Sequence, residues 1–158
     1  MRQIRNLLWF IDDLGPAPID LSRTTKLRDA IFRPRSLNVG WITRALQAIT
    51  YKHRDLRQIL IYMFYSSFLA GIDGDVGHTI GEEIHRQWLE LDSILIQFWE
   101  SRSIRPRLTY MTRAQETQSM QDYFERLLPG TMKWRIIDLV ICAHFREYGH
   151  NLSGSSSY

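Results

Sequence analysis

Three side chains with metal-binding chemistry lie at helical spacing near the middle of the chain. His78, Glu82 and His85 are four and three residues apart, so a helix that began at His78 would carry all three on one face. Imidazole and carboxylate groups are common zinc ligands. Thr79, however, is well suited to cap the helix that follows, which would leave His78 outside that helix. We therefore expect an ordinary exposed helix face and no metal site.

A short acidic and glycine-rich segment, Asp73-Gly74-Asp75-Val76-Gly77, has the composition of a calcium-binding loop. Such a loop needs a third oxygen ligand at its fifth position and a glutamate at its twelfth. Gly77 and Ile84 occupy those positions. The segment also does not contain the Lys-Ser/Thr pair of a phosphate-binding loop. We expect a flexible insertion near residues 64–79 that binds neither calcium nor a nucleotide.

No nucleophile stands in a recognisable catalytic setting in the sequence. Cys142, the one cysteine, follows an apolar run, a position typical of a buried structural thiol. His144 and His150 are close to it in sequence, but this closeness does not establish the geometry of a catalytic triad. No serine lies in a G-x-S-x-G motif. We therefore predict that the protein is not an enzyme and uses no metal ion or cofactor.

The densest group of charged side chains is a set of four arginines: Arg102, Arg105, Arg107 and Arg113. A guanidinium group binds a carboxylate through two parallel hydrogen bonds, so such a cluster suits contact with an acidic partner. Two other interpretations stay open. Nearby aromatic rings could help the arginines to stack on RNA. The arginines could also pair within the fold with Glu90, Asp92 or Glu100.

The composition is that of an ordinary globular protein, with 158 residues of which 44% are hydrophobic and 23% charged. Positive charge is concentrated early in the chain. Residues 1–63 carry eleven basic and five acidic side chains, and residues 64–158 carry nine and twelve. This asymmetry leaves open an alternative function, a nucleic-acid-binding module that uses the basic N-terminal half. Because no dense basic run is present, a nucleic-acid partner is the less favoured one.

Membrane and secretion signals are not recognisable in the sequence. The longest apolar run, Ile59–Phe64, is far shorter than the roughly 20 residues that span a bilayer. The apolar stretch in residues 1–11 is interrupted by Arg5, and no small-residue cleavage site follows it. We expect no membrane contact and an intracellular location, either cytoplasmic or nuclear. The oligomeric state stays open.

Periodic patterns predict the elements that must position these residues. Apolar residues at helical spacing predict three helices. The first contains Val39, Ile42, Leu46 and Ile49 and is capped by Asn38, and the second covers about residues 80–100. The third runs from Met120 to Leu128 and ends at Pro129-Gly130. The tryptophans beside these faces, Trp41, Trp88 and Trp99, are expected in the core. Short β-rich runs predict five strands: Ile4–Trp9, Leu27–Phe32, Leu56–Met63, Arg107–Met111 and Ile136–Ile141.

The alternation of these elements predicts an α/β fold in which short parallel strands alternate with helices. Three strands share the outline L-x-x-L-x-L, with units that start at Ile4, Leu27 and Leu56, at spacings close to those of leucine-rich repeats. We expect one repeat-like domain over residues 1–150, shaped as an irregular leucine-rich-repeat-like arc, and a disordered tail over 151–158. The alternative is an all-α bundle in which Leu56–Met63 is helical.

Four stretches carry a resemblance to a known group of proteins: Leu37–Gln47, His53–Ile59, Arg86–Asp92 and Gln97–Pro106. The chain resembles the C-terminal region of a large group of mostly uncharacterised fungal proteins, some of which carry an F-box ahead of a leucine-rich-repeat-like region. The resemblance covers residues 20–142. No F-box-like segment is recognisable before residue 20, which would fit a domain truncated at its N-terminus.

These observations together predict a non-catalytic protein–protein interaction module, of the kind that serves as the recognition arm of an F-box-type adaptor. Repeat-like surfaces bind proteins more often than they catalyse reactions. The arginines favour an acidic protein partner. The residues expected to bind it flank the predicted strands: Arg57, Gln58, Arg102, Arg105, Arg107 and Asp138.

Overall fold

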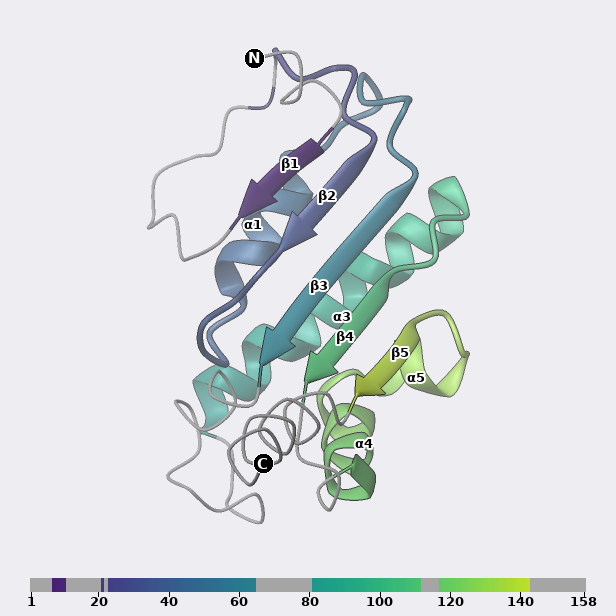
Figure 1. The fold of residues 1–158 in the computed structure, drawn as a ribbon. Coiled ribbons are helices and arrows are strands. Elements are labelled where there is room, and N and C mark those ends of the chain that lie inside the picture. Colours follow the sequence, from purple (N-terminus) through teal and green to yellow (C-terminus); the bar gives the residue numbers. More distant parts are fainter. Residues whose placement is uncertain (1–6, 11–20, 22, 65–80, 112–116, 143–158) are drawn as a thin grey trace, which may run out of the picture.

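Five strands form one parallel sheet, in which the order in space is the order in the chain (Figure 1). The structure is a computed structural model that describes residues 7–10, 21, 23–64, 81–111 and 117–142. The strands are β1 (Leu7–Phe10), β2 (Asp29–Phe32), β3 (Gln58–Phe64), β4 (Arg107–Met111) and β5 (Asp138–Cys142). Neighbouring strands all pair in parallel. The predicted α/β fold is therefore confirmed, and the all-α alternative is wrong because most of Leu56–Met63 belongs to β3.

Helices connect the strands and pack on the sheet. They are α1 (Gly40–Gln47), α3 (Glu82–Arg102), α4 (Thr117–Leu127) and α5 (Pro129–Lys133). Figure 1 shows α1 and α3 behind the sheet, and α4 and α5 beside β5. With 21 residues, α3 is the longest described helix, and it contacts α1, α4 and α5. None of the helices in the described ranges is both long and apolar enough to cross a membrane. The predicted tail over 151–158 and the predicted insertion beyond Phe64 lie outside the described residues.

The two faces of the sheet differ in burial. In β3, Ile59, Ile61 and Met63 are almost completely buried, whereas Leu60 and Tyr62 between them are half-buried. The same alternation occurs in β4. Because successive side chains of a strand point to opposite faces, the buried set faces the helices and the half-buried set faces away from them.

Aromatic rings fill the core between the sheet and the helices. Trp88 of α3 and Tyr110 of β4 both pack on Phe124 of α4, with ring centroids 6.0 and 5.6 Å apart. Trp41 of α1 packs against Phe32 of β2 in an edge-on arrangement. Ring pairs in these geometries stabilise a core beyond their burial alone. The predicted core positions of Trp41 and Trp88 are confirmed.

Two residues expected inside the protein are more exposed than predicted. Trp99 is 41% exposed. It follows Phe98, which faces the core, and the next residue of a helix turns about 100° away. Cys142 is half-buried because β5 is the last strand of the described sheet and pairs with β4 alone.

Strand pairing places residues of the three L-x-x-L-x-L stretches opposite one another. Ala30 pairs with Ile59, as the alignment of the second and third units requires. Leu7 of the first unit should take the equivalent place, but Leu8 pairs with Ala30 instead. In the first unit the residue opposite Ala30 is therefore displaced by one position from the shared outline, and a displacement of one residue exchanges the two faces of a strand.

The observed helix ends differ from the predicted ones in three places. The N-cap of α1 is Val39 rather than Asn38, and that of α3 is Gly81 rather than Thr79. Pro129-Gly130 does not only end a helix but begins α5, because a proline suits the first turn of a helix, where its missing N–H is not needed.

Candidate binding surface at the amino-terminal edge of the sheet

The segments that lead into β2, β3, β4 and β5 meet along one edge of the sheet, because parallel strands all begin at the same edge (Figure 1). We call residues 21–28, 50–57, 102–107 and 133–138 the amino-terminal rim. Five of the six predicted partner-binding residues lie in this rim, and Gln58 follows it directly. The parallel topology therefore brings to one edge residues that are dispersed in the sequence.

Hydrogen bonds join the first two rim segments. His53 is 2% exposed, and its Nδ1 accepts a hydrogen bond from the amide of Thr50 at 3.0 Å. The ring proton is then on Nε2, which donates to the carbonyl of Leu21 at 2.9 Å. The amide of Arg57 donates to the carbonyl of Arg28 at 2.8 Å. Segment 50–57 is thus held beside segment 21–28.

Arg102 links the second rim segment to the third. Its Nη1 donates to the carbonyl of His53 at 2.6 Å and its Nη2 to the carbonyl of Thr50 at 2.5 Å. Its guanidinium also lies 5.7 Å from the centre of the Phe98 ring. Part of the hydrogen-bonding capacity of Arg102 is therefore used inside the fold, where it orders the rim.

The third and fourth rim segments are joined by backbone and side-chain bonds. The amide of Asp138 donates to the carbonyl of Pro106 at 2.8 Å. Arg107 and Asp138 are neighbours in the register of β4 and β5, and Nε of Arg107 lies 2.9 Å from Oδ2 of Asp138. These side chains are 55% and 40% exposed, so water screens the pair and it contributes only about 0–1 kcal/mol to stability.

Positive charge is concentrated in the amino-terminal rim. Its residues include eleven of the twenty basic side chains of the chain and two of the seventeen acidic ones. The rim thus has a net charge of +9, against +3 for the whole chain. All of its basic side chains are exposed except Arg102, which is half-buried. Within the described part of the chain, the guanidinium groups of Arg54, Arg57 and Arg105 form no hydrogen bond or ion pair.

Sequence reasoning missed most of the basic residues in the rim. The missed residues are Arg23, Lys26, Arg28, Lys52, Arg54, Lys133 and Arg135. A signal for them exists, because basic residues stand before the predicted strands and parallel strands begin at a shared edge. Much of the positive charge of residues 1–63 lies in the rim segments 21–28 and 50–57, and segments 102–107 and 133–138 add further basic residues.

Two large aromatic side chains are exposed in the rim. Tyr51 is 75% exposed and Trp134 is 69% exposed, and Nζ of Lys133 lies 5.3 Å from the centre of the Trp134 ring. Tryptophan, tyrosine and arginine are the residue types that contribute most to binding at protein interfaces. The rim therefore combines the residue types of an interface with a strong positive charge.

A groove opens beside the rim, between the end of α1 and the last turns of α3. Its first part has a volume of about 270 Å³, and apolar side chains of Ile49, Ile94 and Phe98 line it. Its second part, of about 600 Å³, extends to Arg54 in the rim. The two parts adjoin each other, because they share three lining residues: Tyr51, Ser101 and Arg102.

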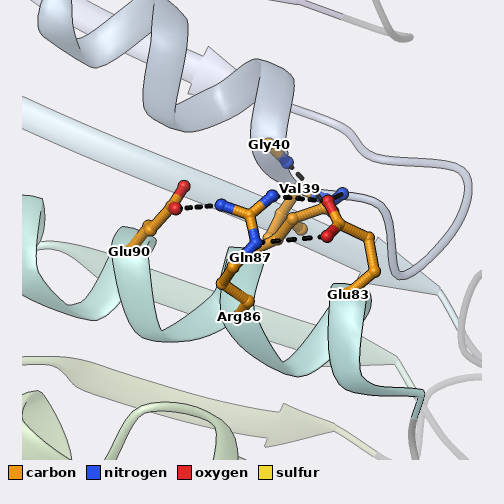
Figure 2. Close-up of polar contacts among 6 residues, drawn as sticks. All are labelled: Val39, Gly40, Glu83, Arg86, Gln87 and Glu90. Atoms are coloured by element: carbon orange, nitrogen blue, oxygen red, sulfur yellow. Dashed lines mark hydrogen bonds and ion pairs between the residues drawn. The ribbon is translucent and has the colours of Figure 1, made fainter.

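A salt-bridge network lies in the first part of α3, beside the start of α1 (Figure 2). Arg86 lies between Glu83 and Glu90 and pairs with both. The hydrogen bond from Arg86, with a smaller contribution from Gln87, holds the pKa of the Glu83 carboxyl below its ordinary value. Glu90 is therefore paired on its own helix and not with the arginines near residue 105.

Side chains of α3 also hold the start of α1. Oε1 of Gln87 accepts hydrogen bonds from the amides of Val39 and Gly40, at 3.1 and 3.3 Å (Figure 2). These amides have no partner within α1 itself, so Gln87 caps that helix from a distance. Nε1 of Trp88 donates to the carbonyl of Leu37 at 3.0 Å. The position of α1, and with it one wall of the groove, therefore depends on α3.

The other candidate sites are only partly within the described residues. Of the three metal-binding candidates, Glu82 and His85 are exposed on α3, and His78 lies outside the described residues. Arg113 of the arginine cluster and the glycine-rich segment 73–77 also lie outside them. Among the residues that the structure describes, there is no group of three or more His, Cys, Asp or Glu side chains that could hold a metal ion.

The fold and the rim define the class of protein as a parallel α/β domain with a basic edge. A scan against protein-family models and searches of curated proteins and of solved structures found no match to this chain. The resemblance to the fungal group therefore stays a prediction.

Proposed function

We propose that this chain is a non-catalytic protein–protein interaction module, and that its amino-terminal rim binds an acidic segment of a partner protein. The observation that carries this proposal is the net charge of +9 along one edge, whose four segments are joined by hydrogen bonds. A surface of one sign steers partners of the opposite sign and raises their rate of association. An ordered surface also loses less conformational entropy on binding.

The kind of charge supports a carboxylate-bearing partner. Eight of the eleven basic rim residues are arginines, whose planar guanidinium groups match carboxylates. The Arg107–Asp138 pair is an example of such a contact within the rim. Arg54, Arg57 and Arg105 could make the same contact with a partner without breaking a bond within the described part of the chain.

We further propose that the chain is intracellular and that it forms an irregular leucine-rich-repeat-like arc. This arc would serve as the recognition arm of an F-box-type adaptor. Sequential parallel strands with helices behind them (Figure 1) are what stacked strand–helix units produce. The pairing of Ala30 with Ile59 supports the equivalence of two of the units. The resemblance of residues 20–142 to the fungal group favours the same interpretation.

Nucleic-acid binding is the second candidate, and one observation favours it. The exposed rings of Tyr51 and Trp134 lie in basic surroundings, as do the aromatic side chains on which unpaired bases stack. The basic residues, however, do not form the dense sequence run that is typical of nucleic-acid-binding segments. We therefore favour the protein partner.

Affinity capture from a cell extract, repeated after the extract has been treated with nuclease, tests the proposed function. Arg105→Glu reverses one unpaired charge in the rim, and Arg126→Glu makes the same change in net charge on α4, where the guanidinium packs on the ring of Tyr123. We expect the wild-type and Arg126→Glu chains to retain the same proteins. Retention by Arg105→Glu should fall about three- to tenfold, as expected when an interfacial charge is reversed.

Four results would contradict the proposal. Loss of every retained partner after nuclease treatment would favour nucleic-acid binding instead. A steep linear fall of affinity with log salt, with a slope of about 0.7–0.9 per phosphate contacted, would point the same way. Equal retention by all three chains, or no retained protein at all, would show that the rim of this chain does not bind a protein.

A further inference from the structure

The groove beside the rim has an apolar floor and polar walls. Ile49, Ile94 and Phe98 are almost buried, but each still contributes surface to the first part of the groove. Gln47 and Gln97 are exposed along its walls. Covering such a floor with an apolar side chain removes apolar surface from water and is therefore favourable.

Positive charge gathers where the groove meets the rim. Arg54 lines the second part of the groove, and its guanidinium has no ion pair within the described part of the chain. Arg102 lines both parts and donates only to backbone carbonyls and not to a carboxylate. All lining residues of the two parts are described, and none of them is acidic. A carboxylate that entered the mouth of the groove would meet two cations and no anion.

An apolar floor beside arginines that have no carboxylate partner selects a ligand that carries both apolar groups and carboxylates. A nucleic-acid strand would bring phosphates to the arginines but no aliphatic group to the floor. An acidic peptide with large apolar side chains satisfies the charges and the floor together.

We propose that the groove receives one or two large apolar side chains of the acidic partner segment, while the carboxylates of that segment pair with Arg54 and its neighbours in the rim. This inference rests on the proposed function and adds the chemistry of the partner. The groove is ordered before binding, because Arg102 fixes Thr50 in its wall and Gln87 fixes the start of α1. The selected partner is therefore an acidic segment with apolar anchors, rather than a merely acidic one.

Fluorescence anisotropy with three labelled probes tests the inference: the peptide EEELEEFEE, nonaglutamate and a uridine decanucleotide. Ser101→Trp places a large ring over the groove, and Ser93→Trp is a matched control on α3. Both serines are exposed, and each donates its hydroxyl to the carbonyl four residues earlier. Circular dichroism of both variants checks that α3 is intact.

We expect EEELEEFEE to bind the wild-type chain about tenfold more tightly than nonaglutamate, since burial of one or two apolar side chains is worth at least that factor. Ser101→Trp should remove this advantage without changing the affinity for nonaglutamate, and Ser93→Trp should change neither affinity. Equal binding of the two peptides, or an advantage that survives in Ser101→Trp, would overturn the inference but leave the proposed function intact. Binding of the oligonucleotide alone, or of no probe, would overturn both.

Discussion

Gly130 occupies a position that has no room for a side chain. A Cβ atom there would lie 2.6 Å from Cδ1 of Ile96 and 2.8 Å from Oδ2 of Asp92. The terminal methyl group of the half-buried Ile96 can shift, but the Asp92 carboxylate is held by hydrogen bonds to Gly130 and Thr131 and cannot move away without weakening them. We expect Gly130→Ala to lower the free energy of unfolding by about 1–3 kcal/mol, as overpacking of a core does. Urea denaturation followed by circular dichroism measures the change.

Gly81→Ala is the control for this substitution. A Cβ atom at Gly81 would meet no atom within 4 Å, and the backbone angles of φ −56° and ψ 150° suit any residue. The loss of a glycine N-cap and the reduced freedom of the unfolded chain oppose each other. We expect the free energy of unfolding to change by less than about 0.5 kcal/mol. Equal effects at the two glycines would refute the steric explanation.

At the scale of elements, α3 caps α5 as well as α1. Asp92 is almost buried, and its Oδ1 accepts hydrogen bonds from the amide and the hydroxyl of Thr131, at 2.9 and 2.8 Å. Its Oδ2 accepts the amide of Gly130 at 2.9 Å. A carboxylate at the first amides of a helix satisfies donors that have no partner within the helix. This explains why Asp92 is inside the fold without an arginine partner.

Removal of this cap should destabilise the protein. Asp92→Ala leaves buried donors without an acceptor, and we expect the free energy of unfolding to fall by about 2–4 kcal/mol. Chemical denaturation of the purified chain measures this value. Asp122→Ala, which removes an exposed carboxylate bonded to Gln118 on α4, should cost less than about 0.5 kcal/mol. A loss below about 1 kcal/mol for Asp92→Ala would contradict the capping role.

The network at the start of α3 predicts a dependence on pH. The hydrogen bond from Arg86 lowers the pKa of Glu83 in the folded state. The contribution of this carboxylate to stability is therefore present above the ordinary glutamate pKa of about 4.3 and is lost as the pH falls through the lowered value. We expect an NMR titration of the Glu83 carboxyl to give a midpoint below about 4.3 and Arg86→Ala to raise it. Arg126→Ala should leave it unchanged, and an unchanged midpoint in Arg86→Ala would refute the assignment.

At the scale of the whole molecule, charge is separated in space. The rim carries +9, and the remainder of the chain has nine basic and fifteen acidic side chains, a net charge of −6. A molecule with one strongly positive edge presents that edge first to an acidic partner, because long-range fields orient proteins before contact. The small net charge of +3 conceals this property, and it becomes visible only when the parallel sheet places four dispersed segments together.

The sequence by itself determined the class of fold and much of the core. Alternating apolar residues predicted β4 with its observed bounds, and helical spacing predicted the burial of Trp88. These features depend on patterns within a few residues, since a strand or a helix buries the face that its own periodicity makes apolar. For the candidate site, local sequence patterns predicted only four of the eleven basic rim residues, and three of these four are the arginines near residue 105.

Only the tertiary structure decided the helix caps, the register of β1 and the extent of the rim. Arg107 pairs with Asp138, 31 residues away, and Asp92 caps the start of α5 at Gly130, 38 residues away. Gln87 reaches Val39 across 48 residues. Contacts at such separations depend on the relative placement of packed elements, and no local period encodes that placement. The positive edge exists for the same reason, because strands that are far apart in the chain begin side by side in the sheet.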